Sequence, residues 1–273
     1  RSDVTAKAAR GRGGRGSACI GFGSGSTLLA RHQVRGAALG EFAAIATAIL
    51  SLAAAVGYGW RFAAAEEKGW RGAGVKTAST GLLAGLLATM PGTGWFWLVP
   101  LGLALGALGD LCLALKGERW FLAGVGAFGL GHLAYAGGFL LRSGALGFDG
   151  VSTGEGVALV VLLGLLVSTE FWLAPRTGDL RWPVRGYVVL IGLRRVAAVF
   201  LPVATGQPVL RWGAALFILS DLMLAIQLFV AKDAGVCRRL ALALWPAYWL
   251  AQAAILFDKF HVMRHLGEAL DRA

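Results

Sequence analysis

The sequence predicts an all-α fold, a polytopic transmembrane helix bundle with about eight spans. Hydrophobic residues make up 57% of the 273 residues and charged residues only 15%, whereas about a quarter of a soluble domain is charged. The mean hydropathy is +0.66. Apolar runs of about 20 residues, the length that crosses the hydrocarbon core as a helix, follow one another along the chain.

The chain divides into three predicted parts. Residues 1–36 are rich in Gly, Ser, Ala and Arg and lack the apolar core of a signal peptide, so we expect a disordered basic tail. Residues 37–258 form the transmembrane domain, and residues 259–273 a short polar C-terminal tail. The spans are predicted near residues 37–58, 73–90, 94–116, 119–141, 152–174, 184–204, 208–231 and 236–257.

The net charge of +11 lies mostly in the short loops and the N-terminal tail. This distribution favours contact with anionic lipid headgroups and disfavours nucleic-acid binding. Most of the short-loop Lys and Arg residues follow the odd-numbered spans, whereas the loops after the second, fourth and sixth spans hold only Arg142 and Arg211. The positive-inside rule therefore places the loops after the odd-numbered spans in the cytoplasm, although the basic tail argues for the opposite orientation.

A weak internal repeat links the third and seventh spans. Gly-Asp-Leu-Cys-Leu-Ala at 109–114 recurs as Ser-Asp-Leu-Met-Leu-Ala at 220–225, and a Tyr follows each in the next span, Tyr135 and Tyr248. A four-plus-four duplication explains the pattern. Chance similarity between apolar segments explains it almost as well.

Two acidic side chains within the spans are the main candidate functional residues. Asp110 on the third span and Asp221 on the seventh are flanked by small residues, which let helices approach closely. Burial favours a neutral carboxyl and two neighbouring carboxyls can share one proton, so such a pair suits general acid–base hydrolysis. Alternatively, each Asp only pairs with Arg194, Arg195 or Lys76 to hold the bundle together.

Uncharged polar side chains on two other spans could support a site. His132 and Tyr135 share one face of the fourth span, and Tyr248 and Gln252 share one face of the eighth. These side chains could orient a carboxylate or line a pocket. They could equally satisfy only each other or a backbone carbonyl.

Basic residues within or near the spans are candidate anion ligands. Arg194 on the sixth span and Lys76 near the start of the second could bind a phosphate, with interfacial anchoring as the alternative for Lys76. Glu170, near a span end, is interpreted as interfacial. The three cysteines and four histidines lack metal-type spacing, so we expect no metal and no cofactor.

Together these segments resemble the YhhN family of membrane proteins, which includes the lysoplasmalogenases. The resemblance covers roughly residues 70–258 and adds Tyr187 as the family's Tyr on the sixth span. It departs from the family where Lys76 precedes Thr77 instead of a Pro, and in the Arg194-Arg195 pair. The matching segments are Gly109-Asp110, Gly131-His132-Leu133-Ala134-Tyr135 with Phe139, Ser220-Asp221 with Leu224-Ala225, and Tyr248 with Ala251-Gln252.

The resemblance implies hydrolysis of the vinyl ether bond of lysoplasmalogens to a fatty aldehyde and a glycerophospho-headgroup. Protonation of the β-carbon gives an oxocarbenium-like ion, water adds to the α-carbon and the hemiacetal collapses, in parallel with glycoside hydrolysis by two carboxyls. Asp110 and Asp221 would then be the catalytic acid and base. The implied supporting residues are His132, Tyr135, Tyr187, Tyr248 and Gln252. Lys76 or Arg194 is expected to contact the phosphate, as their positions in the sequence suggest.

Two other classes of function remain open at this stage. A proton-coupled transporter or lipid exporter could use the same acids, although clear broken helices in both halves are missing. A structural or regulatory membrane protein is the third class. The expected partners are a lysophospholipid and the bilayer, with no oligomeric state predicted. The expected location is the cell membrane of a bacterium or the endoplasmic reticulum membrane of a eukaryote.

Overall fold

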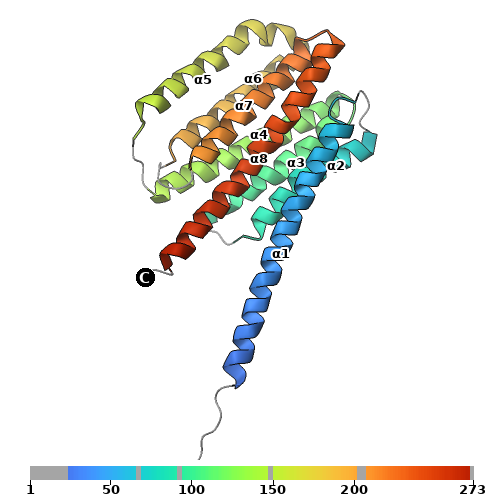
Figure 1. Cartoon of the computed structure of the whole chain (residues 1–273). Coiled ribbons are helices and arrows are strands. Elements are labelled where there is room, and N and C mark those ends of the chain that lie inside the picture. Colours follow the sequence, from blue (N-terminus) through green and yellow to red (C-terminus); the bar gives the residue numbers. More distant parts are fainter. Residues whose placement is uncertain (1–23, 66–68, 91–93, 147–149, 202–206, 271–273) are drawn as a thin grey trace, which may run out of the picture. The chain divides into compact units, whose positions relative to one another are not determined.

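The structure, a computed structural model, describes residues 24–65, 69–90, 94–146, 150–201 and 207–270. These ranges contain α-helices and three short 3-10 helices but no β-strand, which confirms the all-α class (Figure 1). The chain divides into two compact units between Ala43 and Ala44, and the bundle described below belongs to the second. The helices are α1 (Ser24–Arg61), α2 (Gly69–Ala88), α3 (Leu98–Ala114), α4 (Glu118–Leu146), α5 (Thr153–Trp172), α6 (Arg181–Val199), α7 (Gln207–Phe229) and α8 (Ala234–Leu270).

Several of these helices have the length and composition of membrane spans. Five described segments are long and apolar enough to cross a bilayer, and α3 is apolar but shorter. Large apolar side chains such as Ile49, Val160 and Phe257 point outward and are exposed, as expected of a surface that contacts lipid. The protein is therefore a multi-pass integral membrane protein. The five segments are Gly40–Arg61, Glu118–Gly144, Thr153–Arg176, Val209–Phe229 and Ala234–Lys259.

The helices extend beyond the predicted transmembrane domain at both ends of the chain. α1 begins at Ser24, within the segment expected to be a disordered tail, and α8 continues to Leu270, within the expected polar tail. The Ala, Leu and Arg residues of these segments have high helix propensity, which explains the extension. Residues 1–23 and 271–273 lie outside the described residues, so the disorder expected there stays a prediction.

Close helix packing depends on glycine. A Cβ atom at Gly102 of α3 would lie 2.7 Å from the Tyr135 ring of α4, and one at Gly109 would lie 2.6 Å from the Phe128 ring. On α7, a Cβ at Gly213 would lie 2.7 Å from the Cβ of Ala254 on α8. These small residues let α3 pack along α4, and α7 along α8, without an intervening side chain.

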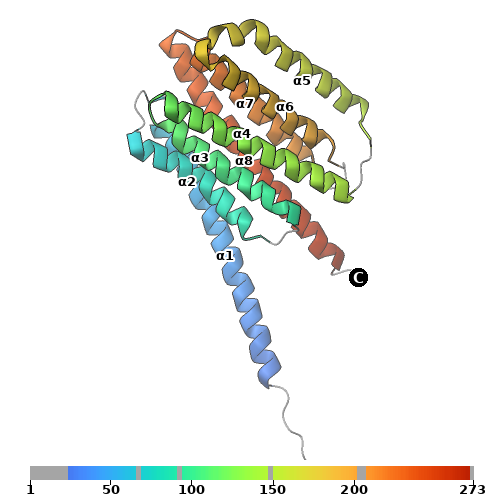
Figure 2. The ribbon, with the colours of Figure 1, turned by 180° about the vertical axis from the view of Figure 1, so that it is seen from behind.

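The order of the helices in space differs from their order in the chain. α3 packs between α2 and α4, and α8 packs along α7 while also contacting α2. Figure 1 and Figure 2, which show opposite sides, both place α5 at the edge of the bundle beside α6. Side chains from α3 and α7, far apart in sequence, can therefore reach one interior space.

Ion pairs connect the helices at the end of the bundle that holds the α4–α5 connection. Arg142 of α4 pairs with Asp258 of α8 at 2.7 Å, and both side chains are buried. Arg211 of α7 pairs with Glu155 of α5, whose backbone and side chain also form a capping box with Ser152. These pairs join α4 to α8 and α5 to α7 at the end of the bundle opposite the candidate site.

Candidate functional site

One cavity, with a volume of about 270 Å³, opens among the helices at the end that holds the basic loops. Its wall uses the C-terminal halves of α1, α3, α5 and α7 and the N-terminal halves of α2, α4, α6 and α8. Most of the lining side chains are apolar. The polar exceptions that matter below are Tyr58, Lys76, Asp110, Tyr187, Asp221 and Tyr248.

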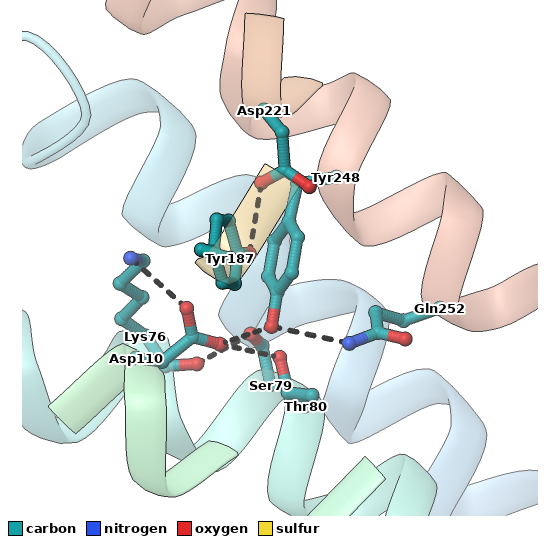
Figure 3. Close-up of polar contacts among 8 residues, drawn as sticks. All are labelled: Lys76, Ser79, Thr80, Asp110, Tyr187, Asp221, Tyr248 and Gln252. Atoms are coloured by element: carbon teal, nitrogen blue, oxygen red, sulfur yellow. Dashed lines mark hydrogen bonds and ion pairs between the residues drawn. The ribbon is translucent and has the colours of Figure 1, made fainter. Parts of the chain in front are cut away.

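Asp110 is buried at the cavity wall and is surrounded by donors. The ammonium nitrogen of Lys76 lies 2.9 Å from Asp110 Oδ1, an ion pair between α2 and α3. The hydroxyls of Thr80 and Tyr248 both donate to Asp110 Oδ2, at 2.9 and 2.8 Å (Figure 3). Lys76 and Thr80 are four residues apart, so one face of α2 presents both to the carboxylate.

A chain of hydrogen bonds leads away from Asp110 into the core. The Gln252 amide nitrogen donates to the Tyr248 hydroxyl at 3.3 Å, and the Tyr135 hydroxyl donates to Gln252 Oε1 at 3.0 Å. All four side chains are at least 95% buried. Tyr135 and Gln252 do not line the cavity, and their hydrogen bonds reach Asp110 through Tyr248.

Asp221 lies on α7 and has a different set of neighbours. The Tyr187 hydroxyl of α6 donates to Asp221 Oδ1 at 3.3 Å (Figure 3). The Nε2 atom of His132 on α4 lies 3.3 Å from the same hydroxyl and 3.9 Å from Asp221 Oδ2. His132 itself is buried behind Tyr187 and packs edge-on against the ring of Phe217.

The structure brings the two aspartates to the wall of one cavity and gives each its own partners. Asp110 forms its ion pair with Lys76, one of the three basic residues that the sequence offered as a structural partner. The Arg195 guanidinium instead donates to the Arg211 carbonyl oxygen. The arrangement is thus one carboxyl beside a cation and one beside phenol and imidazole groups.

The two predicted phosphate ligands have partners inside the bundle. The Lys76 ammonium is bound to Asp110 and also lies 5.8 Å from the ring centre of Trp245. Arg194 is 3% exposed, and its guanidinium stacks 4.3 Å from the Tyr135 ring and 4.4 Å from the Phe217 ring. Arg194 does not line the cavity. A phosphate contact of either residue stays a prediction, and the structure offers a different role for Lys76.

Three residues around the site were missed from the sequence, namely Tyr58 and Trp245 of the cavity wall and Thr80 beside Asp110. Thr80 could have been found, because it follows Lys76 by one helical turn in an apolar span. Tyr58, near the end of α1, has a polar hydroxyl, but nothing else in the sequence around it indicates a site. Trp245 lies in the first half of the predicted eighth span and is 3% exposed, and its indole donates to the Ala55 carbonyl oxygen at 2.8 Å. Glu170, by contrast, is 42% exposed and paired with Arg185, as its interfacial interpretation requires.

The cavity has the chemistry of a general acid–base site for an apolar substrate. Its two carboxyls can donate and accept a proton, its aromatic hydroxyls can orient them, and its apolar wall can hold a hydrocarbon chain. Among the described residues, no cluster of three or more His, Cys, Asp or Glu side chains could hold a metal ion.

Comparison of the sequence with known proteins identifies a family. A family model described as the YhhN family matches residues 72–258, a segment that includes every candidate site residue. Proteins named lysoplasmalogenase from Mycobacterium bovis and Mycobacterium tuberculosis are each 32% identical over 164 residues. A lysoplasmalogenase from Rattus norvegicus is 30% identical over 145 residues. No solved structure matches the chain.

These alignments cover only part of each protein. The aligned segment is 58% of this chain and 58% of each mycobacterial protein, and for the rat protein the shares are 53% and 55%. This chain therefore aligns with little more than half the length of these relatives. The family model covers a larger part of the chain and confirms the resemblance seen in the motifs around Asp110, His132, Asp221 and Tyr248. The chain belongs to the YhhN family.

Proposed function

We propose that this protein hydrolyses the vinyl ether bond of lysoplasmalogens, releasing a fatty aldehyde and a glycerophospho-headgroup. The observation that supports this most strongly is the meeting of Asp110 and Asp221 at one largely apolar cavity inside a membrane protein. Relatives that are 30–32% identical to this chain over the aligned segments are named lysoplasmalogenases. The reaction requires one proton donor and one proton acceptor next to a hydrocarbon-binding surface, which are the groups present.

The proposed reaction uses the two carboxyls in sequence. One donates a proton to the β-carbon of the vinyl ether, and the cation that forms is stabilised by the other, which is a carboxylate. Water adds to the α-carbon and gives up a proton. The resulting hemiacetal collapses, breaking the bond to the glycerol oxygen and forming the aldehyde. General acid–base assistance of this kind is worth roughly 10²- to 10⁴-fold in rate.

The position of the cavity suits a single-chain phospholipid. The cavity occupies the end of the bundle that holds the basic loops, so a headgroup phosphate at that surface would face Lys and Arg side chains. The vinyl ether lies just below the headgroup and would reach the level of the carboxyls. We assign the basic loops to the cytoplasm by the positive-inside rule, in the cell membrane of a bacterium or the endoplasmic reticulum membrane of a eukaryote.

The direct test is aldehyde release by the purified protein in detergent. Lysoplasmalogen should yield one aldehyde per headgroup released, and the reaction in D₂O should place one deuterium on the carbon next to the carbonyl. The saturated ether analogue is the control, because it has no double bond to protonate and should yield no aldehyde. A transporter that uses the same acids would release none from either lipid, and this result would exclude the proposed hydrolysis.

A further inference from the structure

We propose that the two aspartates have distinct roles: Asp221 carries the proton that is transferred to the vinyl ether, and Asp110 is held as a carboxylate by Lys76 and Thr80. The assignment rests on the proposed hydrolysis. It makes Lys76 and Thr80 positioning residues that act through Asp110, and it replaces a headgroup role for Lys76. The two carboxyls differ in their hydrogen-bonding environment, and this difference supports the assignment.

Within the described residues, each polar contact of Asp110 is with a hydrogen-bond donor or a cation. Oδ1 faces the Lys76 ammonium at 2.9 Å, and Oδ2 accepts from both Thr80 and Tyr248. The amide nitrogen of Gln252 donates to the Tyr248 hydroxyl oxygen. The hydrogen of that hydroxyl is therefore left to donate to Asp110. A proton on Oδ2 would have to point at one of these two hydroxyls, so at least one of the two hydrogen bonds would be reversed or lost. The carboxylate form keeps both hydrogen bonds and the ion pair.

The remaining titratable groups near Asp110 are phenols. Tyr58 of α1, Tyr135 of α4 and Tyr187 of α6 interact with its charge through space, in addition to Tyr248 of α8. Lys76 is therefore the charged partner that distinguishes this carboxyl. Its cation neutralises the carboxylate in the bundle interior, where an isolated charge would be costly.

Asp221 has fewer donors and more contact with the cavity. Its side chain is 14% exposed, against 1% for Asp110. One long hydrogen bond, from Tyr187 at 3.3 Å, reaches Oδ1. Among the described residues no hydrogen-bond partner reaches Oδ2. A protonated carboxyl has this pattern, with one oxygen accepting and the other free to present its hydrogen to a substrate.

The two other ionisable groups near Asp221 are His132 and Arg194. Within the described chain the Nδ1 atom of His132 has no hydrogen-bond partner, so a charged ring would leave one of its two N–H groups unsatisfied. Arg194 interacts with Asp221 electrostatically, but its guanidinium contacts the rings of Tyr135 and Phe217. Neither residue forms with Asp221 the short ion pair that Lys76 forms with Asp110.

The reaction balances with these roles. The C=C electron pair takes the proton from Asp221 Oδ2, a C–H bond forms and Asp221 is left as a carboxylate. The cation at the α-carbon takes the oxygen of a water molecule, whose proton passes to Asp110 or back to Asp221. When the hemiacetal collapses, its hydroxyl proton ends on the glycerol oxygen, the C–O bond breaks, and proton exchange restores the starting charges.

The test is the pH profile of kcat/KM, which should be bell-shaped because activity needs protonated Asp221 and ionised Asp110. In Lys76→Met, Asp110 loses its cation and becomes protonated more easily. The acid limb should therefore move to higher pH, by about one unit or more, while the alkaline limb stays in place. Lys76→Arg keeps a cation and should show a smaller shift. A phosphate-binding role for Lys76 would instead raise KM and move neither limb.

Thr80→Val keeps the test decisive if Lys76→Met does not fold. It preserves the side-chain shape, removes one donor to Asp110 and should move the same limb in the same direction by a smaller amount. Movement of the alkaline limb in these variants would assign the transferred proton to Asp110 and overturn the proposal. Unchanged limbs in both Lys76→Met and Thr80→Val would also overturn it, because neither residue would then control the charge of Asp110.

Infrared spectroscopy tests the charge assignment without using activity. Protein in lipid nanodiscs at neutral pH should show a C=O band of a protonated carboxylic acid that disappears in Asp221→Asn and persists in Asp110→Asn. Loss of the band in Asp110→Asn instead, or its absence from the unsubstituted protein, contradicts the assignment. If the protein releases no aldehyde but shows this pattern, the proposed hydrolysis fails while the charge assignment holds.

Discussion

The ammonium of Lys76 and the carboxylate of Asp110 form a 2.9 Å ion pair inside the bundle, with the two side chains 13% and 1% exposed. Removing one partner of a buried pair leaves an uncompensated charge and typically costs about 3–5 kcal/mol of stability. We expect Lys76→Met to unfold at lower temperature than the unsubstituted protein. The double variant Lys76→Met/Asp110→Asn, in which both charges are gone, should recover most of the loss. Thermal unfolding in detergent measures both, and additive losses would show that the pair is not coupled.

Replacing either cavity aspartate should strongly lower turnover in protein that is still folded at the assay temperature, although Asp110→Asn also leaves Lys76 without its partner and should unfold at a lower temperature. Asn keeps the shape of Asp but cannot transfer a proton, so Asp110→Asn and Asp221→Asn should each lower kcat by roughly 10²- to 10⁴-fold. Aldehyde release measures the loss, and size-exclusion chromatography checks the fold. Asp179→Asn, the same substitution at an exposed position, is the control and should retain activity. Near-normal turnover by either cavity variant would remove that residue from the chemistry.

The hydrogen-bond chain behind Asp110 should show a graded effect along its length. Tyr248→Phe deletes the hydroxyl that donates directly to the carboxylate, and a hydrogen bond to a charged group is worth about 1.5–3 kcal/mol. We expect kcat to fall roughly 10- to 100-fold if that contribution is realised in the transition state. Tyr135→Phe, two links farther away, should have a smaller effect. An equal loss in both would indicate that the chain acts through packing.

Glycine packing between α3 and α4 should control stability. A Cβ at Gly109 would lie 2.6 Å from the Phe128 ring, so Gly109→Ala forces the ring or the helix to shift and should cost about 1–3 kcal/mol. Gly126→Ala on α4 is the matched control, since nothing lies within 4 Å of its Cβ position. It should be neutral or slightly stabilising, because Ala favours a helix over Gly. Equal unfolding temperatures for the two variants would contradict the packing argument.

Cysteine labelling tests the orientation of the cavity. Glu118→Cys lies at the cavity end and Val151→Cys at the opposite end, each in a background without the native cysteines. A membrane-impermeant maleimide should label Val151→Cys in intact cells and Glu118→Cys only after the cells are opened, because the basic loops favour the cytoplasm. The reverse pattern would place the cavity on the other side and leave its chemistry unaffected.

The aspartates could be identified from the sequence because an acid in an apolar span is expensive wherever the helix packs. Asp110 and Asp221 needed no knowledge of the helix order to be noticed. The sequence named Lys76, Arg194 and Arg195 as possible partners, but the choice among them depends on how α2 crosses α3, which helical periodicity leaves open. Arg194 shows the same limit, since an intramembrane Arg suggested an anion ligand but its guanidinium stacks between two rings.

The boundaries of the spans were less predictable at the ends of the chain. In the centre, loop glycines and basic residues marked where each helix stops, and α3 to α7 begin and end close to the predicted positions. Near Ser24 and Leu270 the polar composition suggested tails, but both segments are helical. Ala, Leu and Arg have high helix propensity in water as well as in an apolar environment. Trp245 shows that an aromatic residue of a span can face the bundle interior as well as lipid, since its side chain is buried.

The cavity lies at one end of the bundle, so the two membrane leaflets differ in their access to it. Carrying a phosphate headgroup through hydrocarbon means stripping water from a charge, which is strongly unfavourable. Under the proposed function, a lysolipid in the leaflet distant from the cavity would be out of reach until something transfers it across the bilayer. The rate at which such lipids are cleared would then depend on the traffic between leaflets as much as on the chemistry at Asp221, and the aldehyde would be delivered to one membrane surface alone.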